Sequence, residues 1–282
     1  MDDQPGFRGL CVAAFESRMA EEMTRLIRRY GGEPVVTPAL REVPLEDNHP
    51  IFAFGTRLLA DEFDMVIFLT GVGVRYLMEV LQSRYPLESI KRSLIRVTIV
   101  VRGPKPVAVL KEFGLSPAIT VPEPNTWKDL LQILDETTPM LQGRRIAVQE
   151  YGASNPDLLE ELSRRGAEVF PVPVYRWSLP ENVEPLQRTL EQILKGQVHV
   201  ILITNAAQVD NVMTVLDREE RTEAFRHALN QTIVASIGPT ASERLRHYGL
   251  PVDLEPSHPK MGHLVKETSE QGCALLSIKR GA

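Results

Sequence analysis

The sequence predicts an α/β fold made of two similar domains, each built on a parallel sheet. Three observations favour this fold class. Short apolar runs alternate with segments of helical spacing, several stretches recur at a nearly constant offset, and two proline-rich stretches interrupt the alternation at matching places. The length of 282 residues also agrees with about two domains of roughly 150 residues each.

The strands are predicted from continuous apolar runs, whose length and composition are typical of strands buried on both faces. The clearest of these runs are Val66–Leu69, Val97–Val101, Val200–Ile203 and Ile233–Ile237.

Helices are predicted between the apolar runs. In two segments the apolar residues share one helical face with charges opposite: Met19, Met23, Leu26 and Ile27 in the first, and Leu158, Leu159 and Leu162 in the second. Each of these helices is expected to end at a glycine, Gly31 or Gly166, which can adopt the left-handed conformation after a helix. Strands that alternate with helices indicate parallel sheets with helices on both faces.

An internal duplication is predicted from four stretches that recur in the same order. An offset of 135 residues relates Gly31 to Gly166 and Gly103 to Gly238, and an offset of 134 residues relates Thr70, with the apolar run before it, to Thr204. In the fourth stretch, the apolar run that follows Gly9 resembles the one that follows Arg145. The two repeats span about residues 8–137 and 143–282. Unrelated α/β segments would show drifting offsets instead.

Two proline-rich stretches at matching places, residues 38–44 and 171–180, are predicted to be extended connectors. Proline disfavours the helix interior and biases the residue before it toward extended backbone. These connectors are therefore the positions where we expect the chain to cross between domains.

The composition is that of a globular protein without a strong field for nucleic acid, with 43% hydrophobic residues, 24% charged residues and a net charge of −5. Cys11 and Cys273 are far apart and form no CxxC motif, so they predict neither a disulfide framework nor a thiolate zinc site. The acidic N-terminus does not resemble a signal peptide, and no apolar run has the length of a membrane span. We expect a cytoplasmic protein without nucleic-acid or membrane partners.

The chain also lacks the signatures of common cofactor and nucleophile sites. It has no GxGxxG after the first strand, no GxxxxGK[ST] and no GxSxG. His258 and His263 lie in one segment, but no thiol or carboxylate cluster joins them, which favours an ordinary polar loop over a metal site. We expect no cofactor and no metal.

Small, polar or glycine residues follow the predicted strands, and parallel strands gather such loops at one edge of a sheet. Helix N-termini at that edge expose N–H groups that favour anions. The alternative for Thr70, Thr204 and Thr240 is plain helix capping. The predicted ligand-binding residues are Arg18, Thr70, Gly71, Val72, Gly73, Arg102, Gly103, Lys105, Tyr151, Gly152, Thr204, Asn205, Gly238, Pro239 and Thr240.

Tyr175 is the candidate catalytic residue. It lies in the second connector, beside Arg176 and Trp177. Its spacing alone favours a core or hinge aromatic, whereas a phenol at the mouth of an interdomain cleft can donate a proton to a leaving group. The residues leave both interpretations open.

The sequence resembles the uroporphyrinogen-III synthase family over nearly its whole length. Order and spacing together carry the resemblance, because no single motif is decisive. Thr204-Asn205 and Thr240-Ala241 depart from the pairs common in the family. The stretches that match are Phe68–Arg75, Gly166–Arg176, Ala235–Ala241, Tyr248–Val252 and Pro256–Pro259 with Met261, Leu264 and Val265.

The resemblance implies two flavodoxin-like or Rossmann-like α/β domains, joined by a two-stranded connector with a cleft between them. With the two connectors, it predicts one domain from residues 1–39 plus 178–282 and a second from residues 44–173. The implied activity is that of a cofactor-independent cyclising hydro-lyase of tetrapyrrole and haem biosynthesis, acting as a monomer. It would convert hydroxymethylbilane, a linear tetrapyrrole polycarboxylate, to uroporphyrinogen III with loss of water and inversion of ring D. The family's matching tyrosine is a proposed participant, which supports a role for Tyr175.

Two other protein classes fit parts of the pattern. A non-catalytic two-lobed anion-binding protein would use the same cleft, although such proteins are usually exported. A receiver-type regulatory domain needs an acidic cluster after the first strand, and the loop there contains only one acid, Glu16.

Overall fold

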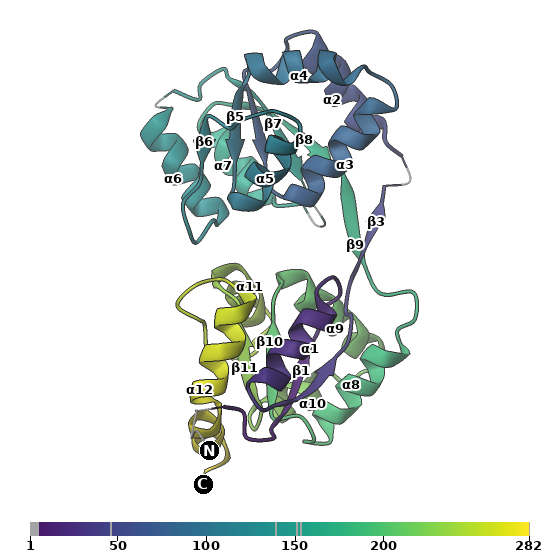
Figure 1. Ribbon diagram of the computed structural model, residues 1–282, viewed down its shortest axis with the longest axis vertical. Coiled ribbons are helices and arrows are strands. Elements are labelled where there is room, and N and C mark those ends of the chain that lie inside the picture. Colours follow the sequence, from purple (N-terminus) through teal and green to yellow (C-terminus); the bar gives the residue numbers. More distant parts are fainter. Residues whose placement is uncertain (1–5, 46, 139, 151, 153, 282) are drawn as a thin grey trace. The chain divides into compact units, whose positions relative to one another are not determined.

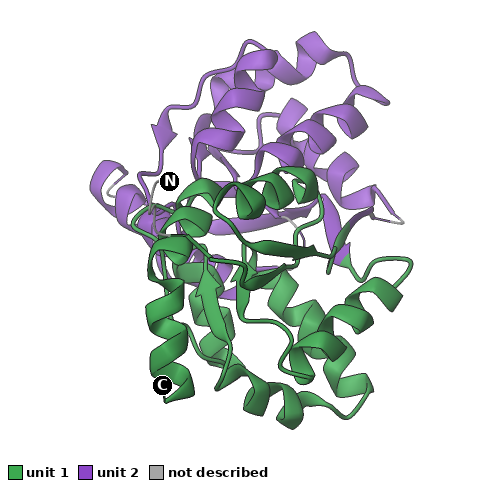
Figure 2. Cartoon of the chain, turned by 60° about the horizontal axis from the view of Figure 1, so that its bottom comes forward, with its two compact units in different colours: residues 1–41, 178–282 green, residues 42–177 purple. Residues whose placement is uncertain are grey.

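The chain divides into two compact units in a computed structural model that describes residues 6–45, 47–138, 140–150, 152 and 154–281. Unit 1 contains residues 1–41 and 178–282, and unit 2 contains residues 42–177 (Figure 2). The borders between the units, at residues 41/42 and 177/178, fall inside the predicted connectors 38–44 and 171–180. The strands β3 (Arg41–Pro44) and β9 (Tyr175–Ser178) span both borders and pair as a separate two-stranded sheet (Figure 1).

Unit 1 is built on a four-stranded sheet in the order β11-β10-β1-β2, and every pair in it is parallel. Its strands are β1 (Cys11–Ala14), β2 (Glu33–Val36), β10 (Val200–Ile203) and β11 (Ile233–Ser236). Its helices are α1 (Ala20–Arg29), α8 (Glu184–Leu194), α9 (Ala206–Arg218), α10 (Thr222–Leu229), α11 (Pro239–His247) and α12 (Met261–Arg280).

Unit 2 is built on a five-stranded parallel sheet in the order β6-β5-β4-β7-β8. Its strands are β4 (Met65–Phe68), β5 (Thr98–Val101), β6 (Ile119–Thr120), β7 (Arg145–Glu150) and β8 (Glu168–Pro173). Its helices are α2 (His49–Leu59), α3 (Gly71–Gln82), α4 (Leu87–Arg96), α5 (Pro104–Glu112), α6 (Trp127–Thr137) and α7 (Pro156–Arg164).

The two sheets share a strand order, as the internal duplication predicts. The order β11-β10-β1-β2 matches β5-β4-β7-β8. The register repeats as well, because Val200 pairs with Ile233 and Val66 pairs with Ile99. Each sheet combines strands from both sequence repeats, so a repeat does not correspond to a unit.

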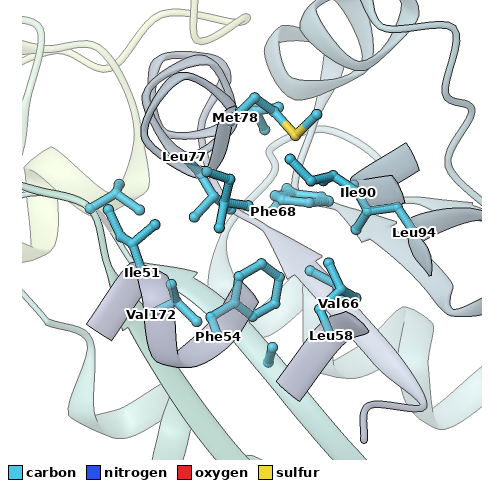
Figure 3. Packing of buried hydrophobic residues seen from close by; sticks show 14 of the residues in the cluster. Ile51, Phe54, Leu58, Val66, Phe68, Leu77, Met78, Ile90, Leu94 and Val172 are labelled. Atoms are coloured by element: carbon cyan, nitrogen blue, oxygen red, sulfur yellow. The ribbon is translucent and has the colours of Figure 1, made fainter. Parts of the chain in front are cut away.

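The central strands are buried on both faces, as their continuous apolar sequences predict. In β4, Val66 and Phe68 face a cluster formed with α2, α3 and α4 (Figure 3). Met65 and Ile67 face the other side of the sheet, where α6 and α7 pack. The strand β10 alternates between two clusters of unit 1 in the same way. Every one of these four clusters lies within a single unit.

The helix ends follow the sequence more closely than the helix starts. Gly31 and Gly166 follow α1 and α7 with φ of +74° and +84°, which confirms their predicted left-handed conformation. Met19 does not belong to the buried face of α1, because it precedes the helix and is 52% exposed. In the described part of the chain, every helix is too short or too polar to cross a lipid bilayer.

Candidate functional site

The predicted ligand-binding residues gather at the carboxyl edge of each sheet, because they follow parallel strands. In unit 2 these are Thr70, Gly71, Val72, Gly73, Arg102, Gly103, Lys105 and Gly152, and in unit 1 they are Arg18, Thr204, Asn205, Gly238, Pro239 and Thr240. Tyr151 lies outside the described residues.

Neighbouring loops within each unit are in direct contact. A methyl group on Gly71 would lie 2.7 Å from the carbonyl oxygen of Lys105, so the loop after β4 lies against the first turn of α5. In unit 1 the N–H of Ile237 donates to the carbonyl of Ile203 at 2.8 Å, which joins the loops after β11 and β10. At each edge, two neighbouring loops are therefore in contact.

Several glycines at these edges are required by protein packing. A methyl group on Gly73 would lie 2.2 Å from Nε2 of Gln149, and one on Gly152 would lie 2.3 Å from the indole of Trp177. Gly152 also has φ of +63°, a conformation that other residues rarely adopt. The close approach of a ligand is not needed to explain either glycine.

Two of the loops already hold a carboxylate of the protein itself. In unit 1 the carboxylate of Glu16 accepts a hydrogen bond from the N–H of Met19 at 3.2 Å and from the hydroxyl of Thr204 at 2.5 Å. In unit 2 the carboxylate of Glu150 accepts from the N–H of Asn155 at 3.3 Å. These negative charges disfavour a bound anion at the starts of α1 and α7.

The helices α5 and α11 begin differently from the others at these edges. Each starts with a glycine and a proline, and Gly103 and Gly238 have nearly the same backbone, with φ of 166° and ψ of −169° and −176°. Neither helix has a side-chain hydrogen bond at its cap. Pro104, Pro106 and Pro239 have no N–H, so these helix starts offer an anion the N–H groups of Lys105 and Thr240 together with the helix dipoles.

The capping alternative holds for one threonine only. The hydroxyl of Thr70 accepts from the N–H of Gly73 at 3.0 Å and caps α3. Thr204 precedes the cap of α9, which is Asn205, and Thr240 lies inside the first turn of α11. Capping of those two helices by threonine is therefore a wrong prediction, because an asparagine and a glycine occupy the cap positions.

Basic side chains accompany these loops. Lys105 and Arg18 are exposed, and Arg102 is half-buried beside Gly103. Arg75, another basic residue near this edge, forms a two-pronged ion pair with Glu112 at 2.7 and 2.8 Å. This pairing lowers the pKa of Glu112 and compensates the charge of Arg75.

Tyr175 lies in the hydrophobic cluster of unit 2 and is only 4% exposed. Its ring centroid is 6.5 Å from that of Trp177, and its carbonyl accepts from the N–H of Gly152 at 3.0 Å. The connector strand β9 is thereby attached to the loop after β7. The packing agrees with the interpretation of Tyr175 as a core aromatic and leaves its proposed proton transfer as a prediction.

Two buried glutamines hydrogen-bond to these loops, and neither was among the residues predicted from the sequence. Gln149 is 1% exposed and accepts from the N–H of Thr70, while Gln208 is 2% exposed and accepts from the N–H of Thr204. The signal for Gln149 is a lone amide in the apolar run of β7. The contact itself joins residues 79 positions apart, which no local pattern indicates.

The structure gives little support to a metal site or to a reactive cysteine. Among the residues that the structure describes, no group of three or more His, Cys, Asp and Glu side chains is arranged to hold a metal ion. Cys11 and Cys273 are both free thiols. Burial raises the pKa of Cys11, which makes it a poor nucleophile.

Comparisons with known proteins point to one family. The model of the family described as "Uroporphyrinogen-III synthase HemD" matches residues 21–266. A crystal structure of a mutant uroporphyrinogen III synthase from the extremely thermophilic bacterium Thermus thermophilus aligns with a TM-score of 0.70 at 28% identity, covering 93% of this chain and 99% of that one.

Two curated proteins are also similar to the chain. A protein of Methanothermobacter thermautotrophicus named "Putative uroporphyrinogen-III synthase" is 29% identical, over 81% of this chain and 85% of its own length. The protein YjjA of Bacillus subtilis, which is named as uncharacterized, is 27% identical over 94% of this chain and 97% of its own length. From the family match and the crystal structure, we conclude that the chain belongs to the uroporphyrinogen-III synthase family.

Proposed function

We propose that the protein is a uroporphyrinogen-III synthase that converts hydroxymethylbilane to uroporphyrinogen III. The observation that carries this proposal is the family match across residues 21–266, on a fold that gathers the predicted binding loops at two sheet edges. The reaction closes the macrocycle, inverts ring D through a spiro intermediate and releases one water. It is a cyclising carbon–oxygen lyase reaction, for which we expect no cofactor.

The carboxylates of the substrate suit the loops of both units. Acetate and propionate groups are anions, and the starts of α5 and α11 offer N–H groups without side-chain caps. Arg102 and Lys105 add positive charge at the start of α5, and Arg18 adds positive charge in the loop after β1. We infer that unit 1 and unit 2 are the two domains of the enzyme and that the loops at both sheet edges bind carboxylates of the substrate.

Positioning is expected to supply much of the rate enhancement. The linear substrate is flexible, and its two ends must meet before the ring can close. When binding holds the two ends in a reactive geometry, the entropy of bringing them together is lost on binding and no longer in the ring-closing step, which raises the rate. Exclusion of water would also protect the azafulvene formed when the hydroxymethyl group leaves.

Tyr175 is the proposed proton donor to that leaving hydroxyl group. Protonation makes hydroxide leave as water, and a phenol is protonated at neutral pH. The ring of Tyr175 is buried in the hydrophobic cluster of unit 2, so the proposed transfer requires the substrate to reach its hydroxyl. We further propose that the enzyme acts as a monomer in the cytoplasm, within haem or related tetrapyrrole biosynthesis.

A coupled assay tests the proposed activity. Hydroxymethylbilane is generated in place by hydroxymethylbilane synthase, the protein is added, and the oxidised porphyrin isomers are separated by chromatography. Isomer III in proportion to the added protein supports the proposal. Isomer I alone, at the rate of the spontaneous reaction, contradicts it. Saturable binding of hydroxymethylbilane without isomer III would favour the alternative of a non-catalytic anion-binding protein.

A further inference from the structure

Two buried glutamines make the same contact to two equivalent loops. The N–H of Thr70 donates to Oε1 of Gln149 at 3.3 Å, and the N–H of Thr204 donates to Oε1 of Gln208 at 2.9 Å. Thr70 and Thr204 are related by the internal duplication, and each follows the second strand of its four-strand pattern.

The glutamines themselves are not related by the duplication. Gln149 is in β7, whereas Gln208 is in the first turn of α9. The repeat partner of Gln149 is Ala14, and the repeat partner of Gln208 is Val74. Unit 1 therefore has no glutamine equivalent to Gln149, and unit 2 has none equivalent to Gln208. In both units, however, a glutamine side chain accepts a hydrogen bond from the threonine N–H. Two different solutions to the same contact indicate that the threonine backbone needs this support.

Filling the core does not explain these amides. Gln149 is 1% exposed and Gln208 is 2% exposed, and a leucine could fill similar space without burying polar atoms. Both amide groups are satisfied through their nitrogens as well. Nε2 of Gln149 donates to the carbonyl of Glu150 at 2.6 Å, and Nε2 of Gln208 donates to Oγ1 of Thr204 at 2.8 Å.

The surroundings are adapted to each glutamine. Gly73 leaves room for Gln149, since a methyl group there would lie 2.2 Å from its Nε2. Oγ1 of Thr204, which accepts from Gln208, donates to the carboxylate of Glu16 at 2.5 Å. Each amide is thus one member of a connected polar network beneath a loop, and such networks fix a single geometry when all members are satisfied.

We propose that Gln149 and Gln208 are positioning residues that fix the backbones of Thr70 and Thr204, so that the neighbouring starts of α5 and α11 keep the geometry that binds the substrate carboxylates. This inference rests on the proposed function. Neither glutamine needs to touch the substrate. Removing one amide frees a threonine N–H and lets its loop leave the geometry that receives an anion.

The test compares Gln149→Leu and Gln208→Leu with two buried controls. Ser93→Ala in α4 changes a polar residue of unit 2 that is 2% exposed, and Thr232→Val, just before β11, changes one of unit 1 that is 1% exposed. Thr232 bonds the carbonyls of Val198 and Ala228, at the amino edge of the sheet and far along the strands from the loops. All proteins are assayed well below their unfolding temperatures, with the folded fraction checked by circular dichroism.

Two measurements are made on each variant. Steady-state kinetics with hydroxymethylbilane separates KM from kcat, and hydrogen exchange follows the amides of Thr70 and Thr204. We expect each leucine variant to raise KM about tenfold with a smaller change in kcat, because the loops bind the carboxylates before and during the reaction. We also expect about tenfold faster exchange at the threonine whose partner is removed, whereas the controls keep wild-type KM and exchange.

The two measurements separate the possible failures. Leucine variants with the KM of the controls overturn the positioning role, whether or not exchange accelerates. Hydrogen exchange at Thr70 and Thr204 that is unchanged in the leucine variants overturns the claim that the glutamine amides hold these backbones. A wild-type protein that forms no isomer III contradicts the proposed function and with it the role in this reaction, while the exchange of the same samples still decides whether the amides hold the loops.

Discussion

Gly73 lies in the first turn of α3, against the buried amide of Gln149. We predict that Gly73→Ala lowers the free energy of unfolding by roughly 1–3 kcal/mol, the range for overpacked cores. The cost should fall when Gln149→Ala is also present, because the smaller side chain makes room for the methyl group. Urea unfolding of the two single variants and the double variant measures this coupling.

A matched glycine serves as the control. Gly262 lies in α12, and no atom lies within 4 Å of the position that an added methyl group would occupy, so Gly262→Ala should be neutral or stabilising by up to about 1 kcal/mol. If the double variant loses as much free energy of unfolding as the two single variants together, the tight contact between Gly73 and Gln149 has no energetic effect.

Tyr175→Phe removes one hydroxyl group from a buried ring. We predict that the variant stays folded, that its cyclisation rate falls by up to about 100-fold, and that uroporphyrinogen I accumulates by spontaneous closure. Partial loss is expected because the azafulvene can form without a proton donor. Chromatography of the porphyrin isomers, together with circular dichroism, checks both parts.

Tyr85→Phe is the corresponding control in unit 2. Its hydroxyl lies 2.9 Å from that of Thr56, at the surface. This variant should keep wild-type turnover. If Tyr175→Phe turns over equally fast, Tyr175 is a core aromatic and positioning is the main source of catalysis.

At the scale of elements, an ion pair joins the starts of β4 and β7. The carboxylate of Asp64, just before β4, accepts from the backbone N–H of Arg145 and from its guanidinium, each at 2.9 Å. The guanidinium of Arg145 holds the pKa of Asp64 below its ordinary value. This pair fixes the register of the two central strands of unit 2 at the edge opposite the loops.

The depressed pKa gives a pH dependence with a definite sign. Asp64 stabilises the fold above its unfolded pKa of about 3.9, and this contribution is lost as pH falls through its lower folded value. We predict that Asp64→Asn costs about 1 kcal/mol at pH 7, since the pair is partly exposed and partly screened.

The pH series has its own control. Urea unfolding from pH 7 down to pH 3 should show the difference between Asp64→Asn and wild type narrowing below about pH 4. Glu88→Gln changes a surface pair with Lys91 and should cost at most about 0.5 kcal/mol throughout. A difference that grows toward low pH would contradict the assignment.

Strands and helix ends could be predicted from the sequence, whereas the helix starts could not. The range of β10 is the predicted one, because a continuous apolar run leaves few choices for a buried strand. The start of α11 was predicted wrongly because threonine is a good capping residue, which favoured Thr240 as the cap. Pro239 instead takes the first helical position, so Thr240 lies inside the first turn. Gln149 contacts Thr70 and Gly73 only because β4 and β7 pair in the sheet, so no local pattern in the sequence predicts these contacts.

At the scale of the whole molecule, the two units have separate hydrophobic cores. Both clusters of unit 2 are formed entirely by residues between 42 and 177. We therefore predict that a fragment of residues 42–177 folds alone. Far-UV circular dichroism and cooperative urea unfolding measure this property, and a fragment without a cooperative transition would contradict it.

The intact chain provides the comparison. Of its two tryptophans, Trp127 lies in α6 of unit 2 and Trp177 lies in β9 at the border, so the Trp177→Phe variant of both proteins leaves Trp127 as the reporter of unit 2. Emission should change at a similar urea concentration in the fragment and in the intact chain. A much lower midpoint in the fragment would mean that unit 2 depends on unit 1 for its stability.

The proposed activity is the closure of hydroxymethylbilane with ring D inverted. The most direct measurement is the ratio of isomer III to isomer I as the protein concentration is raised at a fixed rate of substrate supply. We predict a ratio that rises with protein until isomer III is nearly the only product, because directed closure then outpaces the spontaneous reaction. A ratio that stays at its protein-free value at every protein concentration would contradict the proposed activity.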